Sequence, residues 1–199
     1  MMDDLDVVSD SLVAYSARPV LTSGAHIPAL HVVEPLSGRL VRSFFEPRMS
    51  TAVDSLARFI GWVTSSVRGD TIASVFAPLD TIFLHTIEGE ALARIPLPTT
   101  TFRVVDRPRR PGERPGEWSA GFNFTSDVFW LATGDFVVQF IDLESRVPGQ
   151  HLLGVSRSGE LMFQIDDAPR LHAVLPNGDF LFSPPGADAP NRLVVARRR

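Results

Sequence analysis

The chain has 199 residues, of which 44% are hydrophobic, so it is long enough and apolar enough to bury a core. Its formal net charge of −4 is mild and gives no reason to expect nucleic acid as a partner. It contains no cysteine, which excludes disulfides, thiolate metal sites and cysteine nucleophiles.

The first residues of the chain as given do not predict a signal peptide or a membrane anchor. It reads Met1-Met2-Asp3-Asp4-Leu5-Asp6, which is acidic where a signal peptide is basic and then apolar. No apolar run approaches the ~20 residues that a membrane helix needs. We therefore expect no membrane span and a cytoplasmic location by default. If the chain is N-terminally truncated, the missing residues could include an export signal, and we would then expect an extracytoplasmic location instead.

The first strands are expected within about residues 5–47. Ser11–Tyr15, Ala29–Val33 and Arg39–Phe45 have strand composition, and an opening strand is either absent or formed by Leu5–Val8. The one helix candidate follows at Ser50–Phe59, where apolar residues recur about three positions apart.

Four more strands are expected within about residues 56–98. Their predicted ranges are Phe59–Val67, Thr71–Phe76, Asp80–Thr86 and Ala91–Leu97. Residues 98–119 then form a loop rich in proline and arginine, which predicts an irregular and mobile segment.

Two further groups of strands follow this loop. The third group, about 120–166, has four predicted strands: Val128–Ala132, Phe136–Leu143, His151–Ser156 and Leu161–Ile165. The fourth group, about 170–197, has three: Leu171–Leu175, Asp179–Phe182 and Arg192–Ala196.

Two kinds of glycine turn recur between these strands. A Gly-Asp pair begins at Gly69, Gly134 and Gly178, and a second hairpin type contains Gly38, Gly89 and Gly159. Glycine permits the positive φ that a tight hairpin turn requires. Because hairpins repeat at a regular spacing, the sequence predicts an all-β fold of consecutive four-stranded antiparallel β-propeller blades. It predicts one domain over 1–199 with about three and a half blades, so that the ring is incomplete in one chain.

The chain resembles bacterial six-bladed β-propellers of the NHL and six-bladed-propeller-like group, and it looks like their C-terminal portion. The resemblance rests on the Gly-Asp turns and on the outer hairpins over residues 30–42, 82–98 and 153–165. Six blades of ~40–50 residues need a longer chain than this one. The resemblance therefore implies either missing N-terminal blades or a homodimer that completes the ring.

The resemblance gives almost no indication of an activity. Enzymes of this fold, such as lactonase-like hydrolases, place carboxylates or a calcium ion at the channel mouth. Asp166 and Asp167 end a strand in the region where such loops gather, but no Asp/Asn set with calcium-ligand spacing is evident. We expect no metal, no cofactor and no catalytic residue.

Candidate contact residues fall in two places. His172 lies on the strand that would line the central channel, and Trp118 follows the arginine-rich loop, where an exposed aromatic beside guanidinium groups would suit an anionic or aromatic partner. The other candidate contact residues are three arginines of that loop, Arg109, Arg110 and Arg114. We expect a non-enzymatic binding or scaffold module whose protein or small-molecule ligand, of unknown identity, meets the channel mouth and this loop. The alternative is a hydrolase or lyase with its site at the channel mouth.

Overall fold

The computed structural model describes residues 5–9, 12–19, 25–98, 102–143, 149–183 and 193–196. In this part of the chain, fifteen strands form four separate antiparallel sheets, three with four strands and one with three. We call these sheets blades 1 to 4. Blade 1 contains β1 (Leu5–Ser9), β2 (Leu12–Ser16), β3 (Leu30–Glu34) and β4 (Arg39–Phe44). Blade 2 contains β5 (Val63–Arg68), β6 (Thr71–Phe76), β7 (Thr81–Thr86) and β8 (Ala91–Pro96).

The remaining two blades follow the arginine-rich loop. Blade 3 contains β9 (Asn123–Trp130), β10 (Phe136–Asp142), β11 (Gly149–Val155) and β12 (Leu161–Ile165). Blade 4 contains β13 (Leu171–Val174), β14 (Phe180–Phe182) and β15 (Val194–Ala196). Within each blade the strands pair in sequence order, as in a meander of hairpins.

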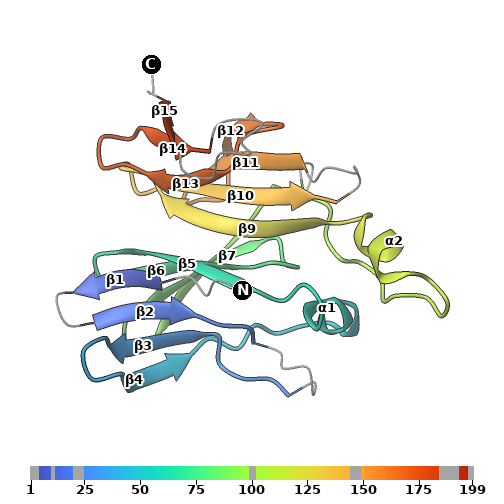
Figure 1. The fold of residues 1–199 in the computed structure, drawn as a ribbon, viewed down its shortest axis with the longest axis horizontal. Helices are drawn as coiled ribbons and strands as arrows, with labels where there is room; N and C mark the ends of the chain where they lie inside the picture. Colours follow the sequence, from blue (N-terminus) through green and yellow to red (C-terminus); the bar gives the residue numbers. More distant parts are fainter. Residues whose placement is uncertain are drawn as a thin grey trace.

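The blades lie face to face in sequence order (Figure 1). Their first strands meet along the inner side, where β1 contacts β5, β5 contacts β9, and β9 contacts β13. The predicted all-β fold of consecutive propeller blades is confirmed.

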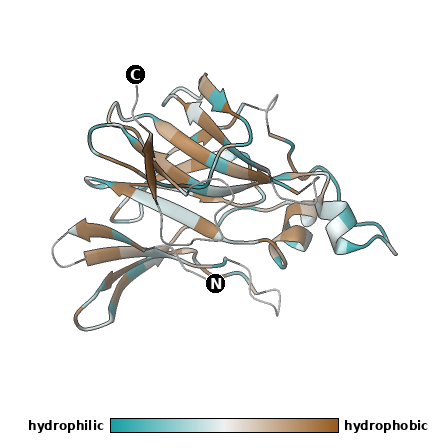
Figure 2. Ribbon diagram, turned by 45° about the horizontal axis from the view of Figure 1, so that its top comes forward, coloured by the Kyte–Doolittle hydropathy of each residue, from teal (hydrophilic) through white to brown (hydrophobic). Residues whose placement is uncertain are grey.

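Apolar residues between the sheets hold neighbouring blades together. Hydrophobic residues run along the strands, whereas the loop that carries the second helix is hydrophilic (Figure 2). One buried cluster joins blades 1 and 2 and includes Leu30 and Phe76, and a second joins blades 2 and 3 and includes Ile82 and Phe136. A third and smaller cluster lies between blades 3 and 4. Since every cluster contains residues of at least two blades, each blade depends on its neighbour for burial of its faces.

Two short helices lie at one end of the blades, before β5 and β9 (Figure 1). The first, α1 (Thr51–Ala57), begins at Ser50, whose side chain accepts a hydrogen bond from the Val53 N–H. It occupies part of the predicted range Ser50–Phe59. The second, α2 (Pro115–Ser119), lies in the loop predicted to be irregular and was not anticipated. No helix in the described ranges is long and apolar enough to cross a membrane.

Of the two alternatives left open for the start of blade 1, the structure shows the opening strand, because β1 pairs with β2 from Leu5 onward. Two strand predictions are corrected. The strand predicted from Val128 begins already at Asn123. The strand predicted from Phe59 begins only at Val63, because the N–H groups of Phe59 and Ile60 both bond to the Leu56 carbonyl just after the end of α1.

The turn glycines adopt the positive φ that the sequence predicts, with values of 57° at Gly69, 91° at Gly134 and 85° at Gly178. The turn at Gly134 also joins two blades. Arg68 of blade 2 donates to the Leu131 and Ala132 carbonyls, each at 2.9 Å, on the approach to this turn.

Candidate functional site

The first strands of all four blades line a half-open cavity of about 400 Å³ along the inner side of the arc. Because each blade contributes its inner strand, this cavity occupies the position of a propeller's central channel, and we call it the channel. The lining residues come from β1, β5, β9 and β13 and are Leu5, Asp6, Ser65, Ser66, Val67, Asp127, Val128, Phe129, Trp130, His172, Ala173 and Val174.

Polar side chains of the channel wall are held by hydrogen bonds across blades and strands. Ser65 Oγ of β5 donates to Asp6 Oδ2 of β1 at 3.2 Å. Gln139 Nε2 of β10 donates to Asp127 Oδ2 at 3.1 Å, while its Oε1 accepts the Leu171 N–H at 2.7 Å. The buried Gln139 side chain therefore fixes both Asp127 and the start of β13, the strand that carries His172.

His172 faces this channel, as the sequence predicts for its strand. Its Nε2 lies 2.6 Å from Ser183 Oγ. Burial, and then the neighbouring positive charge of Arg170, lower the pKa of His172 below its ordinary value of 6.5. The imidazole is therefore neutral at pH 7, with one ring nitrogen a donor and the other an acceptor.

The arginine-rich loop is organised around one carboxylate. Glu113 binds Arg107 through both oxygens, at 2.7 and 2.9 Å, and one of them also accepts the Arg110 N–H at 3.0 Å. These hydrogen bonds, above all those from Arg107, lower the pKa of Glu113 to about 2. Arg109 Nη1 donates to the Glu113 carbonyl at 3.1 Å, and the exposed Arg114 precedes α2 as its N-cap.

Trp118 is buried and not exposed, which corrects the expectation for this residue. It is 1% exposed, its ring packs edge-on against Phe122 at a centroid distance of 5.9 Å, and its Nε1 donates to the Arg107 carbonyl at 3.2 Å. The side chain thus anchors the arginine-rich loop to the core. It offers no surface on which a partner could stack.

The structure does not bring the two groups of candidates together. The channel cavity is lined by the later residues of β5 and β9, whereas α1 and α2 precede the starts of these strands. The loop that carries α2 therefore lies at the opposite end of β9 from the cavity (Figure 1). Binding through Arg109, Arg110 and Arg114 stays a prediction that concerns a separate surface.

Asp166 and Asp167 do not belong to the channel either. Asp166 Oδ1 lies 2.9 Å from His151 Nδ1 and accepts from Gln164 Nε2 at 2.7 Å, so the carboxylate joins the outer strands β11 and β12. Asp167 turns the chain with a φ of 49°. Within the described ranges, no group of three His, Asp or Glu side chains is placed to hold a metal ion.

Sequence reasoning missed the polar residues that accompany His172. Asp6, Ser65 and Ser66 lie on strands that were predicted or left open, and Asp127 immediately precedes the predicted start of its strand, but none of the four was named as a contact residue. The available signal was their placement on inner strands, since Ser65 and Asp127 each precede a Gly-Asp turn along the chain. The side chain of a polar residue on the innermost strand of a blade can point in two directions, and one of them is into the channel.

Comparisons with known proteins show similarity in fold alone. No family model matches the chain, and no curated protein matches it. A solved protein of unknown function from Bacteroides caccae has a TM-score of 0.53 at 12% identity, covering 96% of this chain and 58% of that one. Kuenenia stuttgartiensis hydrazine synthase has a TM-score of 0.51 at 12% identity, covering 96% of this chain and 48% of that one. The chain thus spans about half the length of these structures.

Proposed function

We propose that this chain is a non-enzymatic binding module that holds a ligand in the central channel. The observation that carries this proposal is the convergence of all four inner strands on one cavity of about 400 Å³, with polar side chains on its wall. Cavities of ~300–1,000 Å³ with a few placed polar groups are the usual size for small-molecule sites. Since propellers host many unrelated functions, the step from fold to binding depends on this cavity.

The chemistry of the wall indicates a ligand that donates hydrogen bonds. Asp6 and Asp127 supply carboxylate oxygens, which accept hydrogen bonds only, and Ser66 adds a hydroxyl. The neutral His172 does not offset the two negative charges. A ligand that carries hydroxyl or ammonium groups matches this wall, and the adjacent rings of Phe129 and Trp130 offer apolar contact to its carbon atoms.

A hydrolase or lyase is the second candidate. It is favoured by one observation, the presence of Asp127 and His172 from neighbouring blades in the same cavity. The finer assignment to the six-bladed NHL-like group is also a proposal, and it is supported by the recurrent glycine turns.

The experiment is a ligand titration of the full chain followed by NMR, with neutral sugars, polyols and aliphatic diamines as probes. Specific binding should shift the backbone signals of inner-strand residues. Asp127→Asn should weaken it by about tenfold, the effect of losing one charge-assisted hydrogen bond, and His172→Ala by about fivefold, the effect of losing a neutral one. Glu160→Gln is the matched control, because Glu160 is an exposed acid on an outer turn. Equal weakening by all three variants would contradict channel binding. If the chain converts a bound probe to product and Asp127→Asn abolishes this turnover, the chain is an enzyme and not a binding module.

A further inference from the structure

A second polar cavity lies between blades 1 and 2, on their outer strands. Its volume is about 380 Å³, and its wall comes from the segment that follows β4, from β7 and from β8. It shares no lining residue with the channel. We call it the outer pocket, and the lining residues that matter below are Phe45, Glu46, Phe83, His85, Leu92 and Arg94.

The register of blade 2 places three of these side chains on one face of the sheet. Phe83 and His85 are two positions apart on β7, so their side chains point to the same side. Arg94 of β8 pairs with Phe83 and therefore shares this side. Its guanidinium lies over the Phe83 ring, 5.8 Å from the centroid. The face thus carries an aromatic ring, an imidazole and a cation side by side.

Two backbone irregularities shape the outer pocket. Leu92 is an extra residue of β8, a β-bulge between the partners of Leu84 and His85. Phe45 has a φ of 68°, a left-handed conformation that is costly for a bulky side chain. Its ring centroid lies 4.8 Å from that of Phe83 and 5.0 Å from that of His85. Bulges and strained residues are both concentrated at functional sites.

The His85 side chain lacks a hydrogen-bond partner in the part of the chain that the structure describes. It is 7% exposed, and its Nδ1 is buried and unpaired. Burial, and then the positive charge of Arg94, lower the pKa of His85 below its ordinary value of 6.5, so the ring is neutral at pH 7. The tautomer with its proton on Nε2 avoids burying an unpaired N–H, which leaves Nε2 as a donor for a bound molecule.

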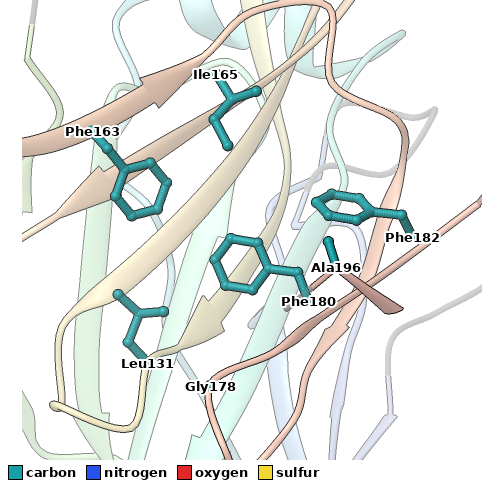
Figure 3. A pocket seen from close by; sticks show the side chains of 7 residues that line it. All are labelled: Leu131, Phe163, Ile165, Gly178, Phe180, Phe182 and Ala196. Carbon is teal, nitrogen blue, oxygen red and sulfur yellow. The ribbon is translucent and has the colours of Figure 1, made fainter. Parts of the chain in front are cut away.

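Two exposed side chains of opposite charge stand on the same wall. Glu46 follows the last strand of blade 1 and Arg94 belongs to blade 2. Neither forms an ion pair with any residue that the structure describes. The cavity between blades 3 and 4 is different, since the side chains labelled in Figure 3 are all apolar. A simple anion in the outer pocket is repelled by Glu46 and a simple cation by Arg94, so the wall favours a molecule with both charges.

We propose that the outer pocket binds a small zwitterion, an α-amino acid with an apolar side chain. The carboxylate of this ligand accepts hydrogen bonds from the Arg94 guanidinium and from His85 Nε2, and its ammonium group donates to the Glu46 carboxylate. Its side chain packs against Phe45 and Leu92. The cavity falls in the range of ~300–1,000 Å³ that is usual for small-molecule sites. This site is separate from the channel and does not depend on the function proposed for it.

The test is isothermal titration calorimetry of the full chain with L-leucine, which should bind saturably with a Kd of about 1 mM or below. Two analogues of leucine each lack one of its charges. 4-Methylpentanoate has no ammonium group, and 3-methylbutylamine has no carboxylate. Each analogue should bind about tenfold more weakly than leucine, the effect of losing one charge-assisted contact.

Three protein variants identify the charges that hold the ligand. Arg94→Gln should weaken leucine binding by about tenfold, whereas Arg48→Gln, at an exposed arginine beside the pocket but not on its wall, should change it by about twofold or less. Glu46→Gln should also weaken leucine binding, but it should not weaken the binding of 4-methylpentanoate, because it removes a repulsion. All three positions are exposed, so the substitutions do not disturb the core.

Several results would overturn the proposal. They are an absence of saturable leucine binding, equal affinities for leucine and either analogue, and equal weakening by Arg94→Gln and Arg48→Gln. Leucine binding that is weakened by Asp127→Asn and not by Arg94→Gln would also overturn it, because the ligand would then lie in the channel. That last result would support the function proposed for the channel, so the failure of one proposal is distinguishable from the failure of the other.

Discussion

Removal of the Arg68 side chain should destabilise the contact between blades 2 and 3. Its guanidinium donates to two backbone carbonyls of blade 3, those of Leu131 and Ala132, both at 2.9 Å. It also lies over the Trp130 ring, 5.9 Å from the centroid, with Arg157 at 5.6 Å from the same ring. Arg68→Ala removes these contacts, and the Leu131 carbonyl keeps its hydrogen bond from the Gly134 N–H at 2.9 Å.

The magnitude follows from the exposure of the contacts. Hydrogen bonds from a charged donor contribute about 1.5–3 kcal/mol when shielded, and we take about 1 kcal/mol each because Arg68 is exposed. A cation–π contact at an exposed site adds about 0.5 kcal/mol. The expected loss is about 2.5 kcal/mol, which corresponds to a fall in Tm of about 5–10 °C for a chain of this size.

The assay is urea unfolding followed by tryptophan fluorescence, with Arg48→Ala as the control at an exposed arginine. Arg68→Lys keeps the charge but lacks the planar fork that reaches two carbonyls, so it should recover less than half of the loss. A free energy of unfolding for Arg68→Ala within about 0.5 kcal/mol of the wild type would refute the reasoning.

Two further predictions concern a turn and a pH dependence. Gly89→Ala should destabilise the protein by about 2–3 kcal/mol and Gly38→Ala by about 1 kcal/mol. Both glycines have positive φ, but only at Gly89 would the added Cβ lie 2.9 Å from the Phe44 ring, and equal losses in urea unfolding would contradict this account. Glu113→Gln should lower Tm at pH 7, because the pKa of Glu113 falls from 4.5 to about 2 on folding. Ionised Glu113 stabilises the fold above pH 4.5, and this contribution is lost as the pH falls toward 2. The Tm difference between variant and wild type should therefore shrink over that window. A constant difference would contradict the Arg107 pairing.

The repeated turns made the fold predictable from sequence. Gly69, Gly134 and Gly178 occupy positions where only a residue without Cβ adopts the required φ at low cost, so the hairpins could be located without knowledge of their neighbours. Helix ends were less predictable. The helix α1 ends at Ala57 although the apolar period runs on to Phe59, and the Leu56 carbonyl then accepts the N–H groups of both Phe59 and Ile60, a local arrangement that the period does not encode.

The burial of Trp118 shows that the sequence alone did not predict the exposure of a single side chain. In the sequence it follows a hydrophilic loop, which favours exposure, yet the fold packs it against Phe122 and pairs its N–H with the Arg107 carbonyl. Whether an aromatic residue beside arginines lies on the surface or in the core depends on the elements that cover it. Trp118 belongs to a buried cluster with Leu56 of α1 and Phe76 of β6, which are distant from it in sequence.

The sequence by itself determined the strands, their turns and the propeller class, because strand alternation and turn φ are local properties of the chain. It also placed His172 on an inner strand. Only the tertiary structure decided that Asp6, Ser65 and Asp127 share the channel with His172, and that the arginine-rich loop lies at the other end of the strands. Residues on different blades meet through the packing of one sheet on the next, and that packing is fixed by non-local contacts that no sequence period records.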